Sequence, residues 1–168
     1  MAGNSSFDVT TGVDYMEVHN AVDQTTKEIT QRYDFKGLKV GIELNAKEKK
    51  IVLTAPDEYK LTAIWDVLQS KMVRRQVPLK NLKPGKVEPA AAATARQEIA
   101  IQDGLTADMA RDVARVIKDA KMKKVQAAIQ GDTVRISSPS KDELQSAITL
   151  LKQQDLGVEL TFGNFRSN

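Results

Sequence analysis

The order of the predicted secondary-structure elements occurs twice along the chain, and this repeat constrains the fold most. Alternating apolar residues predict strands, whereas apolar residues spaced by three and four predict helices. The first half reads as a strand at 7–9, a helix over 15–33, strands at 40–44 and 51–55, a helix over 57–72 and a short strand at 77–79. The second half reads as a strand at 99–101, a helix over 106–120, strands at 125–129 and 134–136, a helix over 140–151 and a strand at 160–162. The sequence therefore predicts two copies of a split βαββαβ unit.

Local signals support several element boundaries. Asp14 and Ser140 are each followed three residues later by glutamate, a pattern that favours helix N-termini. Gly37 follows the first helical segment, where a residue with positive φ often ends a helix. Gly131 and Asp132 separate two alternating segments and predict a tight hairpin. These signals agree with the element order read from periodicity.

The fold class that follows is α+β, with two two-layer sandwiches. Each helix has one apolar stripe, so helices are expected to cover one face of each sheet and leave the other face open. The open faces are predicted to carry Asp8, Thr10, Lys39, Glu43, Val52, Thr54, Ala100, Gln102, Gln126, Ala128, Gln130, Thr133, Arg135, Ser137 and Thr161. None of these residues is aromatic, so base stacking on the sheet, the common mode of RNA-binding proteins with this topology, is not expected.

Composition excludes several classes of site. The chain has 168 residues, no cysteine and a single histidine, His19. Disulfides, thiolate metal sites and zinc sites with several His or Cys ligands are therefore excluded, and no cofactor is expected. No apolar run is long enough for a membrane span, and residues 1–6 lack the features of a secretory signal. We expect no membrane partner and a cytoplasmic location.

Positive charge is concentrated locally, although the formal net charge is only +3. Segment 69–86 contains six cations and no acid, and segment 111–124 contains six cations and two aspartates. Such segments attract phosphate groups. The alternative is a solvated surface that keeps the protein soluble.

Seven cations are the candidate nucleotide-binding residues. Arg111, Arg115 and Lys118 are spaced by four and three and form one helix stripe, which Lys121 continues. Arginine clamps a phosphate through two hydrogen bonds, and lysine supplies a point charge. The alternative is an ordinary exposed helix face. The other candidates lie elsewhere, and they are Arg32 and Lys36 in the segment RYDFKG and Arg166 near the end. For the segment RYDFKG the alternative is a helix stop, in which Phe35 packs inward.

No catalytic or metal-binding residues are predicted. The sequence has neither a Gly-x-x-x-x-Gly-Lys-Ser/Thr loop nor a Gly-x-Ser-x-Gly motif. Trp65 falls within an apolar helix stripe and is expected in the core, and His19 is expected at the surface. We therefore expect a protein that is not an enzyme.

Several separate motifs, in order, resemble the YajQ family. They are FDV at 7–9, NAVD at 20–23, RYDFKG at 32–37, IKDAK at 117–121, IQGDTVR at 129–135, KDELQ at 141–145, DLG at 155–157 and NFR at 164–166. The resemblance covers nearly the whole chain, from Ser6 to Arg166. It implies two ferredoxin-like domains that exchange their first strands. The first domain would comprise 12–84 with strand 97–102, and the second 6–11 with 103–168. Independently of the resemblance, the residues predict a linker at 85–96, because Pro84, Gly85 and Pro89 are followed by an alanine-rich stretch.

The same resemblance implies a nucleotide-binding protein with no established catalytic activity. The implied ligands are a guanine nucleotide or cyclic di-GMP, and some members are linked with RNA. The alternative is an RNA-binding module, with tRNA as one candidate, or a protein-interaction module that acts in translation or with a transcription regulator.

Overall fold

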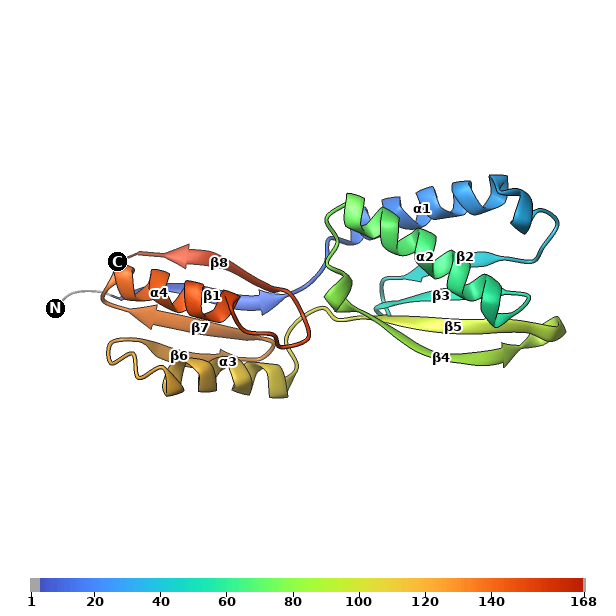
Figure 1. The fold of residues 1–168 in the computed structure, drawn as a ribbon. Helices are drawn as coiled ribbons and strands as arrows, with labels where there is room; N and C mark the ends of the chain where they lie inside the picture. The colour runs from blue at the N-terminus through green and yellow to red at the C-terminus, as the bar shows by residue number, and fades with distance from the viewer. Residues whose placement is uncertain (1–3, 168) are drawn as a thin grey trace. The chain divides into compact units, whose positions relative to one another are not determined.

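The computed structural model describes residues 4–167, and within them the chain forms two four-stranded antiparallel sheets, each covered by helices (Figure 1). The elements are β1 (Ser5–Thr11), α1 (Tyr15–Gln31), η1 (Tyr33–Phe35), β2 (Gly41–Asn45), β3 (Lys50–Ala55), α2 (Glu58–Arg74), η2 (Leu79–Asn81), β4 (Leu82–Ala90), η3 (Ala91–Ala93), β5 (Thr94–Ile101), α3 (Ala107–Asp119), β6 (Gln126–Gln130), β7 (Thr133–Ser138), α4 (Lys141–Lys152) and β8 (Leu160–Arg166). None of the helices within residues 4–167 is long and apolar enough to span a membrane.

The chain divides into two compact units, of which one is formed by Val13–Gln102. Its sheet has the strand order β2-β3-β5-β4, and α1 and α2 pack on it. The Asp14 side chain caps α1 by accepting a hydrogen bond from the backbone N–H of Met16. The apolar stripes of both helices meet the inward residues of the sheet in one core, whose fully buried members include Leu53, Leu61 and Ile99.

The second unit combines the described residues up to Gly12 with those from Asp103 onward. Its sheet has the order β6-β7-β1-β8, covered by α3 and α4. Ser140 caps α4 by accepting a hydrogen bond from the backbone N–H of Glu143. The core of this unit contains Phe7, Val9 and Ile136, all fully buried.

The two helix-covered antiparallel sheets confirm the α+β fold class, and these sheets exchange strands as predicted. The first strand, β1, lies between β7 and β8, and Phe7 is paired with Ile136. In return, β5 lies between β3 and β4, and Ile99 is paired with Ile51. Strand β1 is therefore distant in sequence from both of its neighbours, whereas β5 is distant from β3 and follows β4 after a short turn.

The structure corrects the prediction of a linker at 85–96. Most of this segment belongs to a hairpin formed by β4 and β5, with η3 at its turn, where Ala92 and Ala93 have φ values of 59° and 58°. Pro84 and Pro89 had suggested a break in the strand, but β4 is an edge strand, where a missing backbone N–H is tolerated. The predicted short strand at 77–79 is also wrong, because the strand begins only at Leu82, after η2.

The open sheet faces are polar and internally paired. On one sheet, Lys50 forms ion pairs with Glu48 at 3.0 Å and with Glu98 at 3.2 Å. On the other, the Nε of Arg135 donates a hydrogen bond to Asp8 at 3.0 Å. Much of the charge on these faces is thus paired within the protein.

Candidate functional site

The C-terminal end of α3 leads into a lysine-rich turn. Thr106 starts the helix by accepting a hydrogen bond from the backbone N–H of Met109. The helix ends at Asp119, and Lys121, with a φ of 54°, turns the chain away from the helix axis. Residues 121–125 then lead into β6. The last helical turn contributes one cation, Lys118, and the loop contributes Lys121, Lys123 and Lys124.

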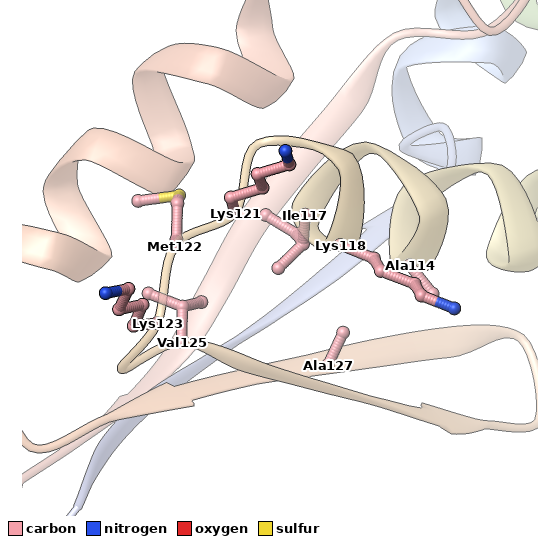
Figure 2. A pocket seen from close by; sticks show the side chains of 8 residues that line it. All are labelled: Ala114, Ile117, Lys118, Lys121, Met122, Lys123, Val125 and Ala127. Atoms are coloured by element: carbon pink, nitrogen blue, oxygen red, sulfur yellow. The ribbon is translucent and has the colours of Figure 1, made fainter.

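A hollow of about 460 Å³ lies between the end of α3 and β6, and we call it the lysine groove (Figure 2). It is lined by Ala114, Ile117, Lys118, Lys121, Met122, Lys123, Val125 and Ala127. Figure 2 shows Ile117 and Ala114 on the helix side and Ala127 on the strand side, with the lysines around them. The groove therefore combines an apolar wall with a positive rim.

A second hollow, of about 390 Å³, adjoins the first, and we call it the loop pocket. It is lined by Ala120, Lys121, Met122, Lys123, Lys124, Ser140 and Glu143. The two hollows share Lys121, Met122 and Lys123. Glu143 is the one carboxylate among the lining residues of the loop pocket. An anionic ligand that extends from one hollow into the other would contact the shared lysines.

The lysines of these hollows differ from the arginines of the same helix in their pairing. Arg111 is paired with Asp108, and Arg115 with Asp112 at 3.0 Å. By contrast, Lys118, Lys121, Lys123 and Lys124 form no ion pair with any residue of the described chain. An ammonium group without a carboxylate partner is available to pair with an anionic ligand.

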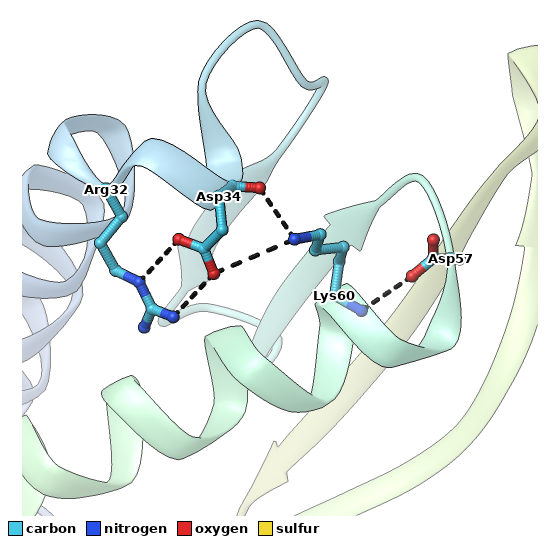
Figure 3. Close-up of polar contacts among 4 residues, drawn as sticks. All are labelled: Arg32, Asp34, Asp57 and Lys60. Carbon is cyan, nitrogen blue, oxygen red and sulfur yellow. Dashed lines mark hydrogen bonds and ion pairs between the residues drawn. The ribbon is translucent and has the colours of Figure 1, made fainter.

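Arg32 belongs to the other unit and is held within a local cluster (Figure 3). Its Nε and one terminal nitrogen donate hydrogen bonds to the carboxylate of Asp34 at 3.0 and 2.8 Å. Lys60 donates to the backbone oxygen of Asp34 at 2.8 Å. The hydrogen bonds from Arg32 lower the pKa of Asp34. Asp57, which caps α2, accepts from the backbone N–H of Lys60 at 2.8 Å.

The aromatic residues of this cluster divide between core and surface. Phe35 is only 2 % exposed, and both Arg32 and Lys60 lie above its ring, at 5.1 and 5.0 Å from the ring centroid. Tyr33 and Tyr59 are 92 % and 79 % exposed. The cluster thus satisfies most of its own polar groups, and Gly37, with a φ of 78°, ends the segment as a helix stop does.

The remaining predicted residues lie outside the lysine groove. Lys36 is exposed at the end of η1. Arg166, at the end of β8, lines a hollow of about 200 Å³ together with Lys141 and Phe165. The ring of Phe165 is 65 % exposed, although its centroid lies 6.0 Å from that of Phe7.

Of the seven predicted residues, the structure brings Lys118 and Lys121 together at one hollow. Sequence reasoning did not include Lys123 and Lys124 in the site, although they follow the helix directly. It also missed that Arg111 and Arg115 are engaged by carboxylates. The spacing was the available signal, because Asp108 and Asp112 each precede an arginine by three residues, the separation at which helix side chains meet.

Within residues 4–167 no group of three or more His, Cys, Asp or Glu side chains is placed to hold a metal ion. His19 lies at the surface, where its Nε2 is 3.2 Å from a carboxylate oxygen of Asp23.

Matches to known proteins extend over nearly the whole chain. The sequence profile of a family described as "Nucleotide-binding protein YajQ-like" matches residues 5–166. A relative from Koribacter versatilis is 51 % identical over 168 residues and covers all of both chains. A relative from Carboxydothermus hydrogenoformans is 49 % identical over 166 residues, 99 % of this chain and all of the relative. Both carry the name nucleotide-binding protein. With two strand-exchanged βαββαβ sandwiches and a match of this extent, the chain belongs to the YajQ family.

Proposed function

We propose that this protein binds a nucleotide, without catalysis, in the lysine groove and the adjoining loop pocket. The observation that carries the proposal is the set of lysines without an ion-pair partner in the described chain, Lys118, Lys121, Lys123 and Lys124, around two hollows that share lining residues. The names of the relatives support the ligand class, because they are called nucleotide-binding proteins. The lysines support the location, since phosphate is the anionic part of a nucleotide.

In the proposed complex the two parts of the ligand occupy different surfaces. The phosphate groups lie against Lys121 and Lys123, which line both hollows. The sugar lies against the apolar wall formed by Ile117, Val125 and Ala127, and the base lies in the loop pocket. A pocket with an apolar wall and a few convergent polar groups is the usual form of a small-molecule site.

For the identity of the nucleotide we propose a guanine nucleotide, with cyclic di-GMP as one candidate. Glu143 lines the loop pocket, and a carboxylate accepts hydrogen bonds from both the N1–H and the amino group of guanine. Adenine carries no N1–H, so it offers this carboxylate one donor group fewer. Two hollows that share Lys121 and Lys123 also suit a ligand with more than one phosphate.

RNA is the second candidate, and the outer face of α3 is the observation that favours it. The side chains of Arg111 and Arg115 are 59 % and 65 % exposed, and ion pairs this exposed contribute little. A polyanion lying across α3 would compete with Asp108 and Asp112 for both guanidinium groups. In that case the lysine groove would be one end of a longer basic surface.

Isothermal calorimetry with the purified chain tests the proposal directly. The ligands are GTP, cyclic di-GMP, ATP and the uncharged nucleoside guanosine. We expect heat of binding with the phosphorylated guanine ligands, weaker binding of ATP and none with guanosine. The absence of binding by every phosphorylated ligand at near-millimolar concentration would contradict nucleotide binding, and equal binding of ATP and GTP would contradict the role given to Glu143.

A further inference from the structure

We propose that the free edge of β6 binds an extended, acidic segment of another protein as an added β-strand. In this mode a partner's backbone pairs with an exposed sheet edge, and alternate side chains enter a neighbouring groove. Strand β6 is the terminal strand of its sheet, in the order β6-β7-β1-β8. Four of its five residues are exposed, and Ile129, although apolar, is 48 % exposed.

The edge of β6 lacks the features that protect the other sheet edges. Natural proteins block edge strands with charged residues, prolines or irregular pairing. The edge strand β4 has Pro84, Pro89 and a register shift, and β8 has a register shift against β1. Strand β2 has Glu43. Strand β6 reads Gln-Ala-Ala-Ile-Gln, with none of these features, and pairs regularly with β7 along its length.

The lysine groove lies directly beside this edge. Ala127 belongs to β6 and lines the groove, together with Ala114 and Ile117 from α3. Because side chains alternate along a strand, every second residue of an added strand would face the helix side. A small apolar side chain there would contact Ala114 and Ile117. This combination of a helix, a groove and a bare edge strand is the geometry in which strand addition gives both affinity and selectivity.

Charge decides which occupant fits. Lys123 and Lys124 immediately precede β6, and Lys118 and Lys121 stand at the groove. None of these four lysines forms an ion pair with another residue of the described chain. A second copy of this chain would bring the same cluster of lysines toward the edge. A segment that carries acidic residues at one end would instead pair its carboxylates with the lysines and its backbone with β6.

The inference stands apart from nucleotide binding, because it rests on the backbone of β6. The two ligands would share Lys118 and Lys121, so the peptide experiments are done in buffer without nucleotide. Failure of calorimetry with nucleotides leaves the strand proposal untouched, and failure of the peptide experiments leaves nucleotide binding untouched.

The test uses the full chain and a short synthetic peptide of alternating valine and threonine with glutamates at one end. Two N-methylated forms of the peptide carry methyl groups on opposite sets of alternate amides. In an added strand only one set of amides faces β6. We expect one form to bind as the parent does and the other to bind at least about tenfold more weakly, since it loses its hydrogen bonds to the edge. The amides of 126–130 that point away from β7 are expected to gain protection from hydrogen exchange.

Charge-reversal variants test which cations contribute to peptide binding. Lys123→Glu with Lys124→Glu is expected to weaken binding of the peptide that ends in glutamates. The same variant should bind a peptide with lysines at that end more tightly than the wild type does. Arg111→Glu with Arg115→Glu, two changes on the outer face of the same helix, is the charge-matched control and should leave peptide binding nearly unchanged. Equal loss with both N-methylated forms, or no change in exchange at 126–130, would overturn the proposal. So would self-association of the free chain through β6, seen by sedimentation together with protection of the same amides.

Discussion

Arg135 in β7 donates a hydrogen bond from its Nε to a carboxylate oxygen of Asp8 in β1, at 3.0 Å, across 127 positions of sequence. The other carboxylate oxygen of Asp8 accepts from the Nδ2 of Asn164 in β8, at 2.6 Å. One side chain of the first strand is thus joined to both strands that flank it. Below the sheet, Phe7 packs at a centroid distance of 6.0 Å from Phe162 of β8. The exchanged strand is therefore held by polar contacts on one face and by the core on the other.

The carboxyl group of Asp8 makes the stability of its unit depend on pH. The hydrogen bond from Arg135, assisted by that from Asn164, lowers the pKa of Asp8 below 3.8. A carboxyl whose pKa is lower in the folded state stabilises the protein above its unfolded pKa of about 4, and this contribution disappears as the pH falls through the folded value. We expect Asp8→Asn to unfold at lower urea concentration than the wild type at pH 7.

Urea titrations at several pH values check this expectation. The difference in stability between wild type and Asp8→Asn should shrink as the pH is lowered below about 4, because the wild-type carboxyl is then protonated as well. A difference that stays constant down to the lowest pH at which the protein folds would show that the ion pair is not its cause.

Because the strands are exchanged, a core substitution in β1 should destabilise the unit that contains α3 and α4, and one in β5 should destabilise the unit that contains α1 and α2. Phe7→Ala removes a fully buried ring from the sheet of β7 and β8, so it should destabilise the unit that contains α3 and α4, by about 3–5 kcal/mol. Ile99→Ala is the matched variant. It should destabilise the unit that contains α1 and α2 by about 2–5 kcal/mol.

Hydrogen exchange followed residue by residue distinguishes the two effects. In Phe7→Ala the amides of α4 should lose protection while those of α1 keep theirs, and Ile99→Ala should give the reverse pattern. Loss of protection in α1 on substitution of Phe7 would contradict the observed pairing of β1.

Salt dependence separates a nucleotide from RNA. Binding of a nucleic acid through many phosphates releases condensed counterions, so its affinity falls steeply as salt is raised, whereas a mononucleotide contacts few phosphates. We expect GTP affinity to fall gently between low and physiological salt in calorimetry or fluorescence titrations. A tRNA affinity that is stronger than that for GTP, and that falls steeply with salt and on charge reversal at Arg111 and Arg115, would favour the RNA alternative.

Periodicity predicted the helices and most strands because each buries one apolar face, and these signals are local. The pairing of Phe7 with Ile136 joins residues far apart in the sequence, so the local alternation of apolar residues could not predict it. The strand exchange was predicted only from the family resemblance. The hairpin of β4 and β5 was missed because Pro84 and Pro89 break an interior strand but are tolerated at an edge.

The candidate site was predicted only in part. Helical spacing placed Arg111, Arg115 and Lys118 on one stripe, but it did not show which cations are neutralised by carboxylates. The hollows depend on the turn at Lys121 and on β6 lying beside α3, and neither can be read from charge alone. Lys118 and Lys121 were therefore foreseen as cations, and their common groove was not.

The central claim, that the unpaired lysines form the nucleotide site, is tested most directly by a pair of charge-matched double variants. Lys121→Gln with Lys123→Gln removes two unpaired cations from the shared part of the hollows, and Arg111→Gln with Arg115→Gln removes two paired cations from the same region of the chain. Calorimetry with GTP and cyclic di-GMP should show that the lysine variant binds at least about tenfold more weakly, a loss of about 1.4 kcal/mol, while the arginine variant stays close to the wild type. Equal affinity of the lysine variant and the wild type, with both folded, would contradict the account.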